Sequence, residues 1–211
     1  MTKRLLDLFS GAGGAAWGYH LAGFEVVGVD NRPQPRYPFA FVQGDALNPP
    51  VRLSEFDAIH ASPPCQLYRI ANNIHGKTDH PNLLAETRGL LESSGVPWVL
   101  ENVPGAPMRA DVVCCGLTFG LGVKRHRWFE SSVALWGAAP CPPGHPGDWV
   151  SVFGHCIQRT YGHGKQTRRV RYSIESGRKA MGISWMDRDE LSQAIPPAYT
   201  EYIGRQLMEV L

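Results

Sequence analysis

The chain lacks the features that mark secreted, membrane-bound or strongly charged proteins. Its 211 residues contain five cysteines in no even, regular spacing, which argues against a disulfide framework and favours reduced thiols. No apolar run approaches the length that crosses a bilayer, and the first four residues lead directly into an apolar segment, so neither an anchor nor a signal peptide is predicted. We therefore expect a cytoplasmic protein. The net charge of +2 is too small to indicate a nucleic-acid partner by itself.

The chain also lacks two common nucleotide-binding motifs, the Gly-Lys-Ser/Thr phosphate loop and the turn with glycines at positions one, three and six. Residues 5–14 instead indicate a strand, a glycine-rich turn and the start of a helix. Glycines let a backbone approach a ligand closely, and a helix N-terminus offers unpaired N–H groups. The turn favours a nucleoside-containing cofactor, with a purely structural tight turn as the alternative.

The first half of the chain alternates apolar segments with helical ones, as is typical of βαβ units over a parallel sheet. Strands are expected at 4–9, 25–30, 39–43, 56–61 and 97–102. Helices are expected at 14–22, 81–94 and 196–211. We predict an α/β fold with a mostly parallel sheet.

Glycines and prolines become frequent after about residue 130 and obscure any helical period. We expect one core domain from residues 1–131 and 178–211, with a short irregular insertion at 132–177. Trp149, Val152 and Phe153 are the expected small core of this insertion.

Chemically useful side chains follow successive predicted strands, and the carboxyl ends of parallel strands share one edge of a sheet. Asp30 lies about twenty residues beyond the glycine turn, the distance at which an acid commonly receives ribose hydroxyls. Asp45 follows the third strand. Cys65 follows two prolines that restrain the backbone, and its thiolate would be a strong nucleophile. Glu101 ends the fifth strand, where partial desolvation would favour its protonated form. A buried structural cysteine and a loop ion pair are the respective alternatives.

Two basic segments indicate a phosphate-bearing partner more strongly than the net charge does. The first segment is residues 124–127 (Lys-Arg-His-Arg). The second segment, residues 165–179, contains six basic side chains and one acidic side chain. An ordinary solvated surface is the alternative.

Four segments together resemble the cytosine-C5 DNA methyltransferases. They are residues 7–14 (Asp-Leu-Phe-Ser-Gly-Ala-Gly-Gly), 62–66 (Ser-Pro-Pro-Cys-Gln), 101–103 (Glu-Asn-Val) and 125–127 (Arg-His-Arg), in the order found in the family. The resemblance covers residues 4–131 and resumes weakly at 193–204, and the short chain suggests the small bacteriophage members. It implies a Rossmann-like, S-adenosylmethionine-dependent methyltransferase fold.

The resemblance also implies roles for individual residues. Cys65 would attack C6 of a flipped-out cytosine, Glu101 would bond its N3 and amino edge, and Arg127 with Arg125 would hold O2 and a phosphate. The implied cofactor site comprises Phe9, Ser10, Gly11, Ala12, Gly13, Gly14, Asp30, Asn31, Asp45, Ala46, Pro64, Gln193, Ala194 and Ile195. The expected DNA contacts are Arg125, Arg127, Lys165, Arg168, Arg169 and Arg171.

The expected partner is double-stranded DNA, with no membrane and a monomeric chain in a bacterial cell or a phage-infected host. The same chemistry on RNA, and a catalytically idle, cofactor-sensing nucleic-acid-binding protein, are the alternatives. The chain departs from the family at Val123, where glutamine is usual, and at Asn31, where an aromatic residue often stands.

The sequence predicts no metal, with a zinc site in the insertion as the alternative. Cys141, His145, Cys156 and His163 lie within or beside the glycine-rich segment, but their spacing matches none of the usual close cysteine pairs of zinc sites. Cys114 and Cys115 follow two valines and are expected to end a buried strand.

Overall fold

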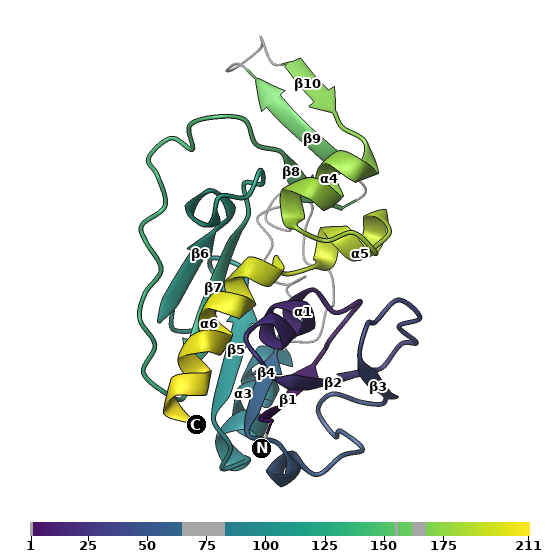
Figure 1. The fold of residues 1–211 in the computed structure, drawn as a ribbon, viewed down its shortest axis with the longest axis vertical. Helices are drawn as coiled ribbons and strands as arrows, with labels where there is room; N and C mark the ends of the chain where they lie inside the picture. Colours follow the sequence, from purple (N-terminus) through teal and green to yellow (C-terminus); the bar gives the residue numbers. More distant parts are fainter. Residues whose placement is uncertain (1, 65–82, 155, 162–167) are drawn as a thin grey trace.

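The computed structural model describes residues 2–64, 83–154, 156–161 and 168–211. Within them lies a seven-stranded sheet in the order β3-β2-β1-β4-β5-β7-β6 (Figure 1). Its strands are β1 (Arg4–Leu8), β2 (Glu25–Asp30), β3 (Ala40–Gln43), β4 (Ala58–Ala61), β5 (Trp98–Asn102), β6 (Val112–Cys115) and β7 (His126–Ser131). Neighbouring strands from β3 to β5 pair in parallel, whereas β7 runs antiparallel to both β5 and β6. The predicted mostly parallel α/β sheet is confirmed.

Alternating side chains of the sheet build a core on each face. Leu5, Val26 and Val99 pack on one side with α1 (Gly14–Leu21) and α6 (Pro197–Val210). Leu6, Val27 and Leu100 pack on the other side with α3 (Leu83–Ser93). All residues of β4 and β5 are buried, and these strands are mostly apolar, with His60, Glu101 and Asn102 as the exceptions.

The first and last helices of the described chain lie side by side on the sheet (Figure 1). A methyl group added at Gly18 of α1 would stand 2.1 Å from the Pro197 carbonyl oxygen and from Thr200 Oγ1. Only glycine permits so close an approach. Thr200 Oγ1 uses the proximity to donate a 2.8 Å hydrogen bond to the Ala15 carbonyl.

The insertion is more regular than the sequence indicated. The strands β8 (Ser151–Phe153), β9 (Cys156–Tyr161) and β10 (Arg168–Arg171) form a small antiparallel sheet. Helices α4 (Ile174–Met181) and α5 (Arg188–Gln193) join it around a third core. Val152 lies in that core, but Phe153 is 51% exposed because successive strand residues face opposite sides. Its predicted place in the core was wrong.

No helix in the described part of the chain has both the length and the apolar character that a membrane span requires.

Candidate active site

A cavity of about 530 Å³ lies at the carboxyl ends of β1, β2, β4 and β5, where ligands gather in open α/β sheets. Residues from both ends of the described chain line it. Of the predicted cofactor residues it takes in Phe9, Ser10, Gly11, Ala12, Gly14, Asp30, Asn31, Pro64, Gln193, Ala194 and Ile195. The predicted catalytic pair Glu101 and Arg127 lines the same cavity.

The glycine turn between β1 and α1 is held in an unusual backbone conformation. Gly11 and Gly13 have φ angles of 49° and 85°, and Phe9, which has a side chain, has 58°. A positive φ at a phenylalanine costs energy and is tolerated where the surroundings fix it. Here the Ser10 N–H donates to the Val29 carbonyl at 3.1 Å, so the turn is tied to β2.

Two further side chains brace this turn. Asp30 Oδ2 accepts the Gly11 N–H at 3.0 Å, and Oδ1 accepts the Arg32 N–H at 3.0 Å. Trp185, which the sequence did not single out, donates its indole N–H to the Ala12 carbonyl at 2.8 Å. Each carboxylate oxygen has two lone pairs, so Asp30 keeps the capacity to accept hydroxyl groups from the cavity.

Three predicted cofactor residues do not line the cavity. Asp45 instead accepts 3.0 Å hydrogen bonds from the Leu47 N–H and the Asn48 side chain, and these bonds hold the pKa of its carboxyl group below the ordinary value. Ala46 is buried in the core beneath β2. Gly13 turns the chain into α1 without reaching the cavity wall.

The loop after β4 is fixed between two strands. The Ser62 N–H donates to the Leu8 carbonyl at 3.2 Å, and Ser62 Oγ donates to the Phe9 carbonyl at 3.3 Å. From the other side, Asn102 Nδ2 donates to the Pro63 carbonyl at 3.1 Å. Asn102 belongs to a predicted motif, but this role was not foreseen. Pro64 lies on the cavity wall, and the predicted nucleophile Cys65, the next residue, lies outside the described residues.

Glu101 and Arg127 form a nearly buried ion pair. Glu101 Oε1 lies 2.7 Å from Arg127 Nε, with side-chain exposures of 7% and 12%. Burial raises the pKa of Glu101, and the positive charges of Arg127 and Arg125 oppose this rise. Because these influences oppose each other, the Glu101 carboxyl group can gain or lose a proton when a ligand in the cavity forms hydrogen bonds with it.

Arg125, the other predicted catalytic arginine, lies outside the cavity wall. It is 7% exposed, and its two amino groups donate to the Val152 carbonyl at 2.8 Å and the Ser192 carbonyl at 2.9 Å. These bonds join the start of β7 to β8 and α5.

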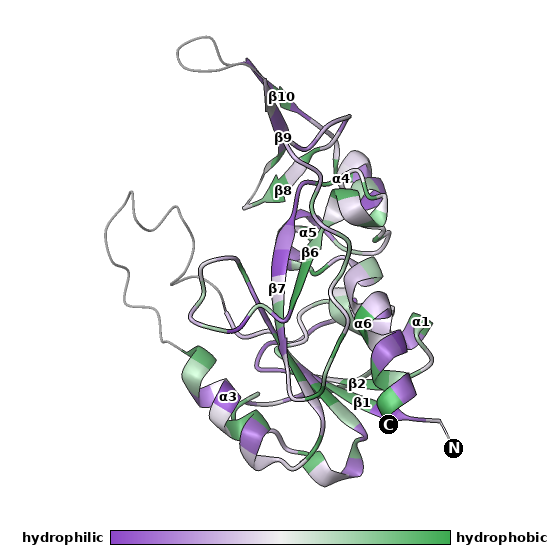
Figure 2. Cartoon of the chain, turned by 90° about the vertical axis from the view of Figure 1, so that its left-hand side faces the viewer, coloured by the Kyte–Doolittle hydropathy of each residue, from purple (hydrophilic) through white to green (hydrophobic). Residues whose placement is uncertain are grey.

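The predicted DNA-contacting arginines of the insertion are exposed on β10, namely Arg168, Arg169 and Arg171. Figure 2 shows the hydrophilic character of this strand and of its neighbour β9. Lys165 lies outside the described residues.

No family model matches the chain. The type II methyltransferase M.AquIA of Picosynechococcus sp. is 32% identical in an alignment 126 residues long that covers 50% of this chain and 50% of that protein. The chain thus spans about half the length of this curated relative.

Two solved structures resemble nearly the whole chain. The S. pombe Dnmt2 methyltransferase has a TM-score of 0.65 at 13% identity and covers 99% of this chain and 98% of its own. A prophage-encoded E. coli protein assigned as a DNA modification methyltransferase has a TM-score of 0.61 at 14% identity and covers 99% of both chains. The fold of this chain is the Rossmann-like methyltransferase fold.

Proposed function

We propose that the protein is a DNA (cytosine-5-)-methyltransferase that uses S-adenosylmethionine and a covalent adduct of Cys65. The observation that carries the proposal is the Glu101–Arg127 ion pair, which shares one cavity with the glycine turn and with Pro64, the residue bonded to Cys65. The partial match to a type II methyltransferase supports the same activity.

The residues of the cavity suit the proposed cofactor. About 530 Å³ is an ordinary size for a pocket that holds a small molecule. Asp30 offers acceptors for ribose hydroxyls, and the start of α1 offers backbone N–H groups to a carboxylate. Among the described residues, no side chain caps that helix end. When bound, S-adenosylmethionine supplies an electrophilic methyl group.

The chain's own residues would prepare the base for the reaction. The target cytosine must leave the duplex, because C5 and C6 are shielded within the base stack. Glu101, with its raised pKa, would donate a proton or hydrogen bond to N3, and Arg127 would bond O2. Both contacts offset the negative charge that develops when the Cys65 sulfur adds to C6.

The reaction at the cytosine ring would proceed by addition, methyl transfer and elimination. Addition of the Cys65 thiolate to C6 would place an electron pair at C5. C5 would then take the methyl group as the bond between that group and the sulfonium sulfur breaks, which leaves S-adenosylhomocysteine. C5 then loses its proton to a base, the S–C6 bond breaks, and Cys65 leaves as a thiolate. The product is 5-methylcytosine.

The decisive experiment compares wild type with Cys65→Ser on duplex DNA and on duplex DNA that contains 5-fluorocytosine. Wild type should methylate the first substrate and form a denaturant-resistant adduct with the second. In 5-fluorocytosine, fluorine replaces the C5 hydrogen, so there is no C5 proton to lose and the Cys65–C6 bond cannot break. Cys65→Ser should do neither while still binding S-adenosylmethionine. Near-normal turnover by the variant would disprove the role of the thiol.

The same assay on tRNA tests the substrate. Methylation of tRNA in preference to duplex DNA would replace the DNA assignment with the RNA alternative. Binding of DNA with no transfer under any condition would favour the cofactor-sensing binding protein instead. Bisulfite sequencing of DNA from cells that express the protein would then report the sequence context of any modified cytosine.

A further inference from the structure

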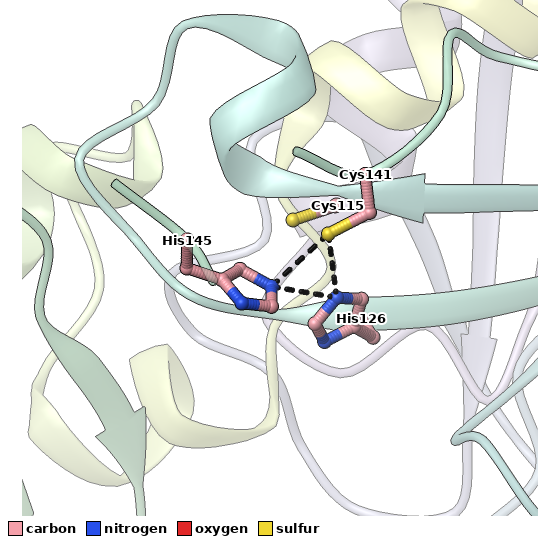
Figure 3. A group of neighbouring side chains, drawn as sticks. All are labelled: Cys115, His126, Cys141 and His145. Carbon is pink, nitrogen blue, oxygen red and sulfur yellow. Dashed lines mark hydrogen bonds between the residues drawn. The ribbon is translucent and has the colours of Figure 1, made fainter. Parts of the chain in front are cut away.

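Four potential metal ligands from three separate segments converge beside the sheet, away from the cavity. They are Cys115 at the end of β6, His126 at the start of β7, and Cys141 and His145 in the connection to the small sheet (Figure 3). Their ligand atoms all lie within 4.8 Å of one another. In Figure 3 both imidazole rings direct a nitrogen at the sulfur of Cys141.

The fold supplies the ligands in two pairs. Cys115 and His126 are directly opposite each other in the antiparallel register of β6 and β7, which brings such side chains together on one face. Cys141 and His145 are four residues apart on a tight turn, in which the His145 N–H donates to the Pro142 carbonyl at 3.2 Å. Trp149 donates its indole N–H to the His145 carbonyl at 2.7 Å and so anchors the turn.

The backbone of His145 is itself unusual. Its φ angle is 51°, in the left-handed region that residues with side chains seldom adopt. Such a conformation persists where surrounding contacts favour it, and it often marks a functional site. Here it aims the imidazole at His126 and Cys141.

The distances approach those of a tetrahedral site. Cys141 Sγ lies 3.0 Å from His145 Nε2 and 3.4 Å from His126 Nε2, and the two nitrogens are 3.1 Å apart. Zinc bonds of about 2.3 Å to sulfur and about 2.0 Å to nitrogen place tetrahedral ligand atoms about 3.3 to 3.8 Å apart. An outward movement of a few tenths of an ångström among these three side chains would therefore make room for the ion, with Cys115 Sγ within 4.8 Å of each of them as the fourth ligand.

We propose that Cys115, His126, Cys141 and His145 bind one structural Zn²⁺ ion. Two thiolates and two imidazoles are a set that favours zinc, and four protein ligands leave no position open for catalysis. The two thiolate charges neutralise the ion. The site differs from the sequence expectation of no metal, because only the fold brings Cys115 and His126 to the turn at 141–145.

The ion would connect the small sheet to the strand that carries Arg127. His126 precedes Arg127 in β7, and the segment after His145 leads to Val150, whose backbone pairs with Gly122 and Lys124. The metal thus would hold the insertion at a fixed place relative to the Glu101–Arg127 pair. This role does not depend on the reaction that the cavity performs.

The test measures metal in the purified protein by mass spectrometry and follows Zn²⁺ release with a colorimetric chelator. Wild type should contain about one zinc per chain. Cys115→Ala and His145→Ala should lose it, whereas Cys114→Ala, altered at the neighbouring strand position, should retain it. Substitution with Co²⁺ should give the visible absorption bands of a tetrahedral site with two thiolates.

A second readout guards against misfolding. The turn variant His145→Ala should keep the circular dichroism of the wild type but should no longer gain thermal stability from added Zn²⁺. A wild-type chain without zinc after growth in zinc-supplemented medium would overturn the proposal. So would a Cys115–Cys141 disulfide in the intact protein, or undiminished zinc in both ligand variants.

Discussion

Glu101 experiences opposing influences at the end of β5, since burial favours its neutral form and Arg127 favours its charged form. We expect Glu101→Gln to reduce methyl transfer about 100-fold or more, because an amide keeps the shape but cannot give up a proton. Steady-state transfer of labelled methyl groups to DNA measures this loss. The exposed substitution Glu86→Gln should leave the rate unchanged, and a fully active Glu101→Gln variant would contradict the assignment.

His60 predicts a pH dependence of stability. It is wholly buried in β4, where it bonds the Tyr19 hydroxyl at 3.0 Å, and burial lowers its pKa from 6.5 to about 3. Between these values the unfolded chain binds a proton that the folded chain does not. Stability should therefore fall by about 1.4 kcal/mol per pH unit as the pH drops below about 6.5.

The variant His60→Asn isolates this effect, because its amide can still meet the Tyr19 hydroxyl but does not titrate. Urea unfolding at several pH values between about 4 and 7.5 should show a shallower decline for the variant than for the wild type. Parallel curves would show that other groups cause the acid sensitivity.

Sequence reasoning found the residues whose position follows from a strand end. Glu101, Asp30 and Pro64 line the cavity because β5, β2 and β4 deliver them there. It did not foresee that Arg125 would bond two carbonyls, or that Trp185 would brace the glycine turn. These contacts join segments far apart in the chain, and no local pattern encodes them.

At the scale of elements, the contact between α1 and α6 depends on glycines, and Gly18 makes the closest approach. Gly18→Ala should destabilise the protein by about 1 to 3 kcal/mol, because the added methyl group would meet a backbone carbonyl and Thr200 Oγ1 at 2.1 Å. Gly89→Ala in α3 is the matched control. Nothing lies within 4 Å of its added methyl group, so it should stabilise by about 0.5 to 1 kcal/mol.

Denaturant unfolding of the Gly18→Ala and Gly89→Ala variants, with the wild type beside them, measures both changes in stability. Equal midpoints would mean that α1 and α6 can separate without loss.

The parallel elements were predictable because buried βαβ units leave a strong apolar pattern, as in β4 and β5. The antiparallel β7 was missed, since its first half reads as a basic cluster, His126 and Arg127. In α4 and the small sheet, short elements and many polar residues leave little periodicity.

For the whole molecule, the exposed arginines of β10 predict how nucleic-acid binding responds to salt. Arg169 and Arg171 are two residues apart and so share one face of the strand. Replacing both with glutamine should weaken DNA binding and lower the slope of log affinity against log salt by about 2. Arg205→Gln, on α6 beside Glu201, should leave the slope unaltered. An unchanged slope in the double variant would place the DNA elsewhere.

The cavity wall joins Gly11 and Gly14 to Ala194 and Ile195, residues that translation produces at opposite ends of the described chain. A nascent polypeptide that still lacked residues 193–195 would present only part of the cavity wall. Tight retention of a nucleoside ligand would then begin only once these later residues had been made, so that synthesis itself would delay the onset of ligand binding.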